Sequence, residues 1–130
     1  MRAETINVLL VDDNKRLISA WERLISQQPD MKFVGSLASA DELTSTARAA
    51  AANIVLLDLS MDGRDPLSAV AELARECPEV RTLIYSGHSR DDWYDRARDA
   101  GAIEFVDKAE DPIAILALIR RLAHSSQSTI

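Results

Sequence analysis

Five polar positions in this 130-residue chain follow runs of apolar residues, and their side chains together could handle a phosphoryl group. These residues are the pair Asp12 and Asp13, then Asp58, Ser86 and Lys108. Clustered carboxylates suit a hard divalent cation such as Mg²⁺, which prefers oxygen ligands. If a phosphoryl group is delivered to Asp58, the cation, the Lys108 ammonium and the Ser86 hydroxyl would each compensate one of its oxygens.

Asp58 is the candidate nucleophile, because a carboxylate can attack phosphorus and form an acyl phosphate. Taken singly, an aspartate at the end of a strand is more often a helix cap or a turn residue. Asp13 or Asn14, for example, is also placed to cap a first helix. The joint occurrence of these side chains at several strand ends in one short chain favours a functional site.

The apolar runs before these residues predict strands that are buried on both faces, as in a parallel sheet. The predicted strands cover residues 8–11, 33–34, 54–57, 83–85 and 105–107. Ligands of an open parallel sheet bind at the carboxyl ends of its strands. The polar positions are therefore expected to meet in one crevice.

Helical patterns alternate with the strands, which predicts a doubly wound α/β fold of five strand and helix units. The first predicted helix begins after Asp13 and stops at Pro29, and the second runs from a capping box at Ser39 and Glu42 through Ala52. The third starts at Pro66 and stops before Pro78, and the fourth runs from Ser89 and Asp92 to Gly101. The fifth covers 113–123 and is opened by Asp111 and Pro112. Residues 1–124 are expected to form one domain. Residues 125–130 read as a polar tail or the start of a linker.

The composition, with 47% apolar residues, fits one compact domain with a core. A net charge of -6 and the lack of a Lys/Arg-rich stripe argue against direct binding of nucleic acid or an anionic membrane. The single Cys77 and the distant His88 and His124 predict neither a disulfide nor a zinc site. Without a signal-peptide pattern or a membrane-length apolar stretch, a cytoplasmic location is expected.

With these motifs in place, the chain resembles the receiver domain of two-component response regulators over essentially its whole length. The correspondences are Asp12 and Asp13 with the family's acidic pair, Asp58 with the phosphoacceptor, Ser86 with the conserved hydroxyl, Lys108 with the invariant lysine, and Phe105 with the aromatic switch position. The resemblance implies a flavodoxin-like sheet of strand order 2-1-3-4-5. It also implies a signalling domain that takes part in its own phosphotransfer and autodephosphorylation rather than an enzyme acting on other substrates.

The resemblance further implies a Mg²⁺ site formed by Asp13, Asp58 and the Ser60 backbone carbonyl, with Asp12 acting through water. The phosphoryl group would come from a histidine kinase, a phosphotransfer protein or a small phosphodonor. Ser60 and His88 lie where family members have side chains that flank the phosphoryl group, although a histidine in a surface loop is the simpler reading.

Three positions depart from the family pattern: Asp62 replaces a usual proline, Pro66 a usual glycine, and Ala109 a proline after the lysine. A proline four residues after Lys108 resembles the branch with a C-terminal helix-turn-helix, which would make this a regulator of transcription. The apolar run 113–119 predicts an output surface on the fourth helix, fifth strand and fifth helix, for a homodimer or an output domain.

Two other functions fit part of the pattern. A Mg²⁺-dependent aspartyl-phosphate phosphatase would carry a second acid two residues after its nucleophile, where this chain has Ser60. A receiver-like interaction module that is never phosphorylated would be expected to have lost the acidic pair, the phosphoacceptor or the lysine, and all are present.

Overall fold

The apolar runs become the strands of one parallel sheet in the computed structural model, which describes residues 5–61, 63–87 and 90–124. The strands are β1 (Ile6–Val11), β2 (Met31–Leu37), β3 (Ile54–Leu57), β4 (Arg81–Ser86) and β5 (Glu104–Asp107). Their order is β2-β1-β3-β4-β5, and each neighbouring pair is parallel. The predicted flavodoxin-like fold is therefore confirmed.

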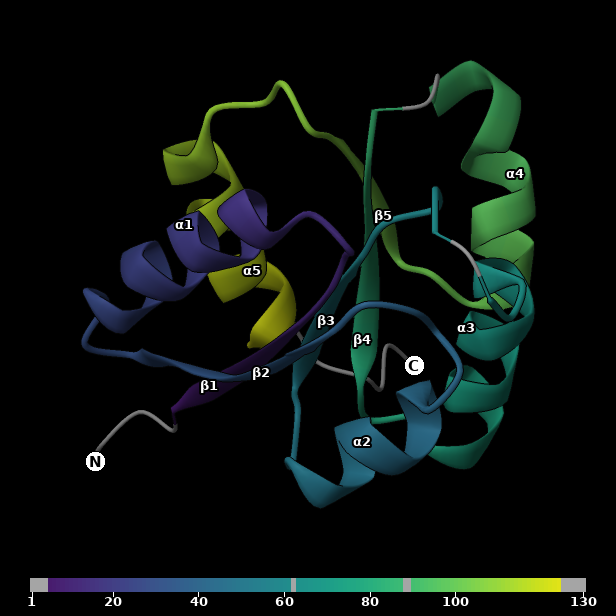
Figure 1. The fold of residues 1–130 in the computed structure, drawn as a ribbon, viewed down its shortest axis with the longest axis horizontal. Helices are drawn as coiled ribbons and strands as arrows, with labels where there is room; N and C mark the ends of the chain where they lie inside the picture. Colours follow the sequence, from purple (N-terminus) through teal and green to yellow (C-terminus); the bar gives the residue numbers. More distant parts are fainter. Residues whose placement is uncertain (1–4, 62, 88–89, 125–130) are drawn as a thin grey trace.

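Helices cover both faces of the sheet (Figure 1). They are α1 (Lys15–Ser26), α2 (Leu43–Ala49), α3 (Pro66–Glu76), α4 (Arg90–Ala100) and α5 (Pro112–Ala123). α1 and α5 lie on one face, and α2, α3 and α4 lie on the other. Within the described residues, no helix has the length and apolar character needed to cross a membrane.

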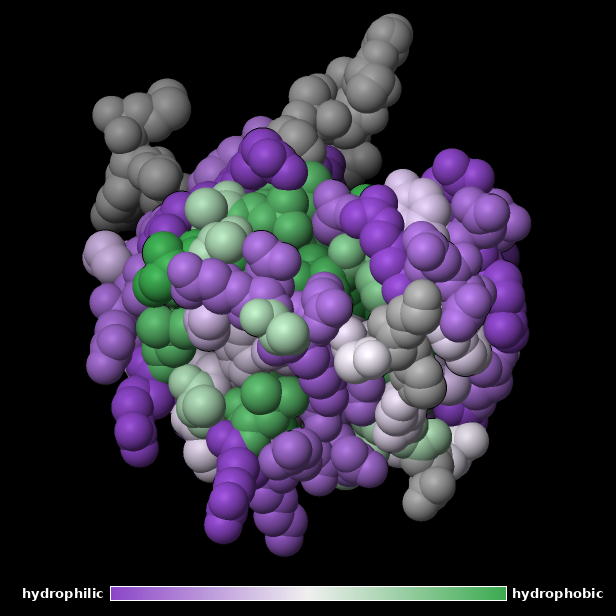
Figure 2. Space-filling view, turned by 90° about the horizontal axis from the view of Figure 1, so that it is seen from above, coloured by the Kyte–Doolittle hydropathy of each residue, from purple (hydrophilic) through white to green (hydrophobic). Residues whose placement is uncertain are grey.

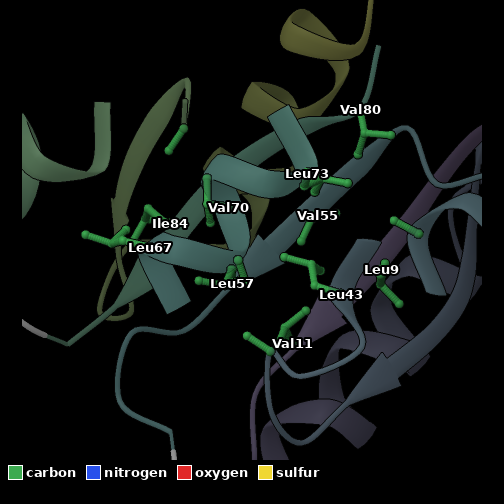
Figure 3. Close-up of a cluster of buried hydrophobic side chains, with 14 of the residues drawn as sticks. Leu9, Val11, Leu43, Val55, Leu57, Leu67, Val70, Leu73, Val80 and Ile84 are labelled. Carbon is green, nitrogen blue, oxygen red and sulfur yellow. The ribbon is translucent and has the colours of Figure 1, made fainter. Parts of the chain in front are cut away.

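Two apolar layers hold these helices to the sheet. Successive side chains of a strand point to opposite faces. Leu9 and Val11 of β1 therefore pack toward α2 and α3, whereas Val8 and Leu10 pack toward α1 and α5. Figure 3 shows the first layer, in which side chains from β1, β3 and β4 meet those of α2 and α3. With both faces of the sheet covered, the strand ends are where polar side chains reach solvent.

The second strand is longer than the predicted 33–34. β2 spans Met31–Leu37 and includes the exposed Lys32 and Ser36. It is an edge strand that pairs only with β1, so polar residues can be accommodated in it. Between Val8 and Leu9 of β1 the register shifts from Phe33 to Gly35 of β2, and this irregularity interrupts the alternation of side chains along β2. The apolar signal therefore underestimates the strand.

The predicted capping box of the second helix is wrong. α2 begins at Leu43 with Glu42 as its N-cap, and Glu42 makes no side-chain cap bond. Ser39 instead accepts the N–H of Asp41 with its hydroxyl, at 3.3 Å. The helix also ends at Ala49 rather than running through 52, because Ala51 turns into the left-handed region with φ 54° and closes a Schellman-type end.

The other helix ends follow their predicted signals. The Asn14 side chain accepts two backbone N–H groups and caps α1. Asp65 and Asp111 cap α3 and α5, each ahead of a first-turn proline. Gly101, with φ 113°, follows the last turn of α4. Ser89, the predicted start of α4, lies outside the described residues.

The last turns of α5 are fastened to the rest of the domain. Arg120 donates from Nε to one Asp30 oxygen at 2.7 Å and from a terminal nitrogen to the other at 3.0 Å. The same terminal nitrogen donates to the Gln28 side chain at 2.8 Å. Arg81, at the start of β4, donates to the backbone carbonyl of Leu122. The C-terminal end of α5 is thus held to the start of β4 and to the loop before β2.

Asp30→Asn is expected to lower the free energy of unfolding by about 1 kcal/mol at neutral pH, because it weakens a two-point, charge-assisted contact. The hydrogen bond from Arg120 lowers the pKa of Asp30 below its ordinary 3.8. The contribution of Asp30 to stability is therefore fully present above pH 3.8, the ordinary pKa of this group in the unfolded chain. It is lost as the pH falls through the lower pKa that Asp30 has in the folded protein. Urea unfolding should show parent and variant converging in acid, and a difference independent of pH would contradict this. Glu22→Gln, at an exposed acid of α1, is the control.

Candidate phosphoryl and cation site

The carboxyl ends of β1 and β3 place two carboxylates beside each other. The strands are neighbours, with Val11 paired to Leu57, so the residues that follow them start side by side. The N–H of Asp58 donates to the Val11 carbonyl at 2.9 Å. The side chains of both Asp12 and Asp58 are buried. The sequence patterns predicted this meeting of strand ends.

The ends of β4 and β5 bring the hydroxyl and the lysine to the same edge. Ser86 pairs with Asp107 across these strands, and the N–H of Lys108 donates to the Ser86 carbonyl at 3.0 Å. Ser86 is fully buried. Figure 2 views the molecule from this edge, with hydrophilic surface prevailing on the side of α3 and α4 and hydrophobic surface gathering on the side of α1 and α5.

Three carboxylates form a compact cluster at this edge. One oxygen each from Asp12, Asp13 and Asp58 lies within 4.8 Å of the others. Asp13 is exposed, so the cluster opens to solvent through this residue. The N–H of Asn14 donates to Asp12 Oδ1 at 2.9 Å and orients that carboxylate.

Lys108 is the cation that faces the cluster. Its Nζ lies 2.8 Å from Asp12 Oδ2 and 3.5 Å from Asp58 Oδ1. Burial works to lower the pKa of Lys108, but the hydrogen bonds and charges of the two carboxylates outweigh it and raise that pKa. Burial raises the pKa of Asp58, and the Lys108 charge offsets this only in part. Within the part of the chain that the structure describes, the single Lys108 ammonium at the cluster therefore leaves the three carboxylates undercompensated.

The carboxylate cluster fits a hard divalent cation. Asp12 Oδ2 is buried, and its close partner among the described residues is the Lys108 ammonium at 2.8 Å, an ion pair that leaves the remaining hydrogen-bonding capacity of this oxygen unfilled. A buried oxygen left in this way is costly unless a cation or water completes its surroundings. The ligand atoms on offer are all carboxylate oxygens, which suits Mg²⁺.

Ser86 and Phe105 lie on the same face of the sheet. Phe105 pairs with Ile84, two residues before Ser86, and successive side chains of a strand alternate between faces. Phe105 is buried in the apolar layer that also contains Ala97 of α4. The hydroxyl and the aromatic ring are therefore neighbours along one face that packs against α4.

The loop after β3 carries Ser60, whose side chain is exposed. A hydrogen bond from the Ser60 backbone acts on the Asp58 carboxylate and lowers its pKa, against the effect of burial. Asp62 and His88, which were singled out from the sequence, lie outside the described residues.

Two departures from the family pattern have local explanations. The N–H of Ala109 donates to Asp107 Oδ1 at 2.8 Å, a bond that a proline at this position could not make. Pro66 occupies the first turn of α3, where a missing N–H costs nothing.

Sequence reasoning missed an aromatic contact next to the site. Lys108 Nζ lies 5.8 Å from the centroid of the Tyr85 ring, which meets Trp21 of α1 edge to face at 5.7 Å. The alternation of side chains in β4 was the available signal, because it directs Tyr85 to the opposite face from Ser86.

The family of response regulator receiver domains matches residues 8–120 of the chain. Among curated relatives, the response regulator UvrY of Escherichia coli is 30% identical over 115 residues, which cover 88% of this chain and 53% of UvrY. The response regulator protein VraR of Staphylococcus aureus is 29% identical over 117 residues, which cover 90% of this chain and 56% of VraR. The chain thus spans about half the length of the curated relatives it matches.

Solved structures share this architecture. A LuxR-family two-component response regulator from an Aurantimonas species matches with a TM-score of 0.84 at 28% identity, covering 92% of this chain and 86% of the other. The response regulator domain of Thermotoga maritima CheB matches with a TM-score of 0.85 at 22% identity, covering 95% and 99%. At that lower identity, the likeness to CheB concerns the fold alone.

Proposed function

Because this chain belongs to the family of response regulator receiver domains, we propose that it is a phosphorylation-controlled switch with Asp58 as its phosphoacceptor. The observation that carries the proposal is the buried Asp58 carboxylate beside both the acidic pair and Lys108. These carboxylates and the Lys108 ammonium come from separate strand ends. A helix-capping role at one strand end does not account for their convergence.

Transfer begins at the Asp58 carboxylate. One of its oxygens attacks the phosphorus of the donor, the bond from phosphorus to the donor's leaving atom breaks, and an acyl phosphate forms. Lys108 Nζ, 3.5 Å from Asp58 Oδ1 before transfer, is close enough to shift onto a phosphoryl oxygen. Burial around Asp58 excludes bulk water and strengthens that pairing.

The cation is assigned as Mg²⁺, held by Asp13, Asp58 and the Ser60 backbone carbonyl, with Asp12 acting through water. The carboxylate cluster and the family resemblance support this set. When bound, Mg²⁺ would neutralise charge that develops on the phosphoryl oxygens. Before that, Asp12 and Lys108 hold each other in place through their 2.8 Å contact.

Mg²⁺ at tenfold excess over its Kd is expected to raise the free energy of unfolding by about 1.4 kcal/mol. Mg²⁺ should relieve the repulsion among the carboxylates of Asp12, Asp13 and Asp58, which Lys108 compensates only in part. Asp13→Ala should remove the effect, whereas Asp99→Ala, at an exposed acid of α4, should keep it. Thermal unfolding with and without Mg²⁺ measures both. A parent protein whose Tm ignores millimolar Mg²⁺ would count against the metal site.

The proposed switch couples the position of the Ser86 hydroxyl to that of the Phe105 ring. A new phosphoryl group draws the Ser86 hydroxyl toward one of its oxygens, and Phe105 fills the vacated space beside α4. Their shared face of the sheet and the burial of both side chains support this coupling. A paired packing change of this kind has two discrete arrangements, as a switch requires.

The output surface comprises α4, β5 and α5, and a homodimer or an output domain would bind there. Ile113 is 62% exposed, and a cavity of about 340 Å³ lies between β5 and α5. Hydrophobic surface also gathers on the α5 side of the edge in Figure 2. Exposed apolar surface beside a cavity is typical of an interaction site.

Loading Asp58 with a beryllofluoride mimic is expected to change either the mass in solution or the hydrogen exchange of residues 90–123. The packing change at Phe105 reaches α4 directly. Light scattering and hydrogen exchange, with Asp58→Asn as the unresponsive control, measure this. Unchanged mass together with unchanged exchange would refute this output surface.

The donor is a histidine kinase, a phosphotransfer protein or a small phosphodonor, and water later hydrolyses the acyl phosphate in an autodephosphorylation. Residues 1–124 are assigned to the receiver domain and 125–130 to a tail or linker, and both 1–4 and 125–130 lie outside the described residues. Similarity to a LuxR-family regulator supports a transcriptional role through a following helix-turn-helix, and a cytoplasmic location goes with it.

The test is the intact mass of the chain after incubation with acetyl phosphate and Mg²⁺. One added phosphoryl group is the expected result, and it should disappear with time as the acyl phosphate hydrolyses. A mass that never changes under these conditions would refute the proposed function.

A further inference from the structure

The loop that leaves the phosphoacceptor is anchored at its far end to the loop before α2. Asp41 Oδ1 accepts the backbone N–H of Arg64 at 2.7 Å, across 23 positions of sequence. Asp41 follows β2 and Arg64 precedes α3, so this bond joins two loops at the edge of the sheet where Asp58 lies.

Gly63 allows the two loops to approach this closely. Its φ is 101°, in the region that favours glycine, and a Cβ there would lie 2.8 Å from Asp41 Oδ1 and 3.3 Å from the Ser39 Cβ. A side chain at position 63 would therefore strain the backbone and crowd Asp41, so glycine allows the Arg64 N–H to reach Asp41 Oδ1.

The residues on both sides of Asp62, which itself lies outside the described residues, are held by contacts to neighbouring elements. Before it, the N–H of Asp58 is bonded to β1 and Leu59 is buried. After it, Arg64 bonds to Asp41 through its backbone and to Glu72 of α3 through its guanidinium, at 2.6 Å. Ser60, whose carbonyl is proposed to face the cation, lies in the short span between.

We infer that Asp41 is a positioning residue for the cation site, acting through the Arg64 N–H on the loop that presents the Ser60 carbonyl. The inference rests on the proposed function, because it concerns the same Mg²⁺ site. Asp41 is exposed, so its loss should cost little global stability while it loosens the loop. The hydrogen bond, rather than the charge of Asp41, is the property that matters.

Calorimetric titration of the full chain with Mg²⁺ separates bond from charge. Asp41→Ala is expected to raise the Kd by about tenfold at most, because Asp41 bonds Arg64 rather than a ligand itself, and removing a direct outer-shell partner of a ligand costs about 10- to 100-fold. Asp41→Asn keeps an Oδ1 acceptor without the charge and should stay near the parent. Asp41→Glu keeps the charge but displaces the carboxylate by one methylene group, and should weaken binding. Asp99→Ala, at an exposed acid of α4 outside both loops, serves as the control and should bind Mg²⁺ as the parent does.

Hydrogen exchange without Mg²⁺ supplies the second readout, with faster exchange expected across 59–65 in Asp41→Ala and parent-like exchange in Asp41→Asn. Equal Mg²⁺ affinity in the parent and Asp41→Ala would overturn the inference, and so would a loss in Asp41→Asn as large as in Asp41→Ala. If Asp41→Ala does not fold, the opposite responses expected of Asp41→Asn and Asp41→Glu decide the question. A parent protein that binds no Mg²⁺ would overturn the proposed site, and this inference with it.

Discussion

Asp58→Asn is expected to abolish phosphoryl incorporation from acetyl phosphate. The substitution keeps the shape of the side chain and replaces the nucleophilic oxygen pair by an amide, which forms no acyl phosphate. The loss should be complete, because Asp13 is exposed and Asp12 is already paired with Lys108. Neither is placed to substitute for a carboxylate at the end of β3.

Intact mass and Phos-tag electrophoresis measure the incorporation. Asp99→Asn, at an exposed acid on α4, should label as the parent does. A thermal melt of Asp58→Asn verifies that the variant is folded, and it should be at least as stable as the parent without Mg²⁺, since a buried carboxylate has been neutralised. Full labelling of Asp58→Asn would show that the phosphoacceptor is another residue.

Lys108→Gln is expected to destabilise the metal-free protein by about 2 kcal/mol. Breaking a fully buried ion pair costs roughly 3–5 kcal/mol, and Lys108 is 28% exposed, so the cost is smaller. The variant leaves Asp12 and Asp58 buried without their ammonium. Mg²⁺ should stabilise it more than it stabilises the parent, because the competing cation is gone.

Urea unfolding with and without Mg²⁺ measures both effects. Lys15→Gln, at an exposed lysine of α1, should change neither. Adding Asp58→Asn to Lys108→Gln should recover part of the lost stability, because one uncompensated charge is removed. Equal stability of Lys108→Gln and the parent in the absence of Mg²⁺ would mean that Lys108 does not compensate the cluster.

Much of this arrangement was predictable, because it depends on burial. The runs of β1 and β3 are apolar on both faces, so their type, their parallel pairing and the meeting of Asp12 with Asp58 follow from pattern alone. What pattern does not determine is the partner of a side chain. Lys108 lies nearer Asp12 than Asp58, which rotamers and local packing decide.

The errors and omissions lie in the loop before α2, in the edge strand β2 and in the contact of Lys108 with Tyr85 of β4. The cap of α2 was predicted from local sequence, but the residues before that helix are engaged elsewhere, with Asp41 bonded to Arg64. A contact between two irregular segments has no periodicity, so no sequence pattern announces it. The edge strand β2 was underestimated because it needs less apolar surface than a central strand.

Arg120 and Arg81 fix the carboxyl-terminal end of α5 to the rest of the domain, so any tilt of this helix would pivot about that end. It has 12 residues and is therefore about 18 Å long. Its first turn adjoins Lys108, while its last turns are tied to the amino-terminal side of the sheet. The first turns of α5 are packed against the sheet through Ile115 and Leu116, so a tilt of the end that carries Ile113 would have to repack these two side chains. In such a movement the tied end of α5 would keep its place beside the start of β4.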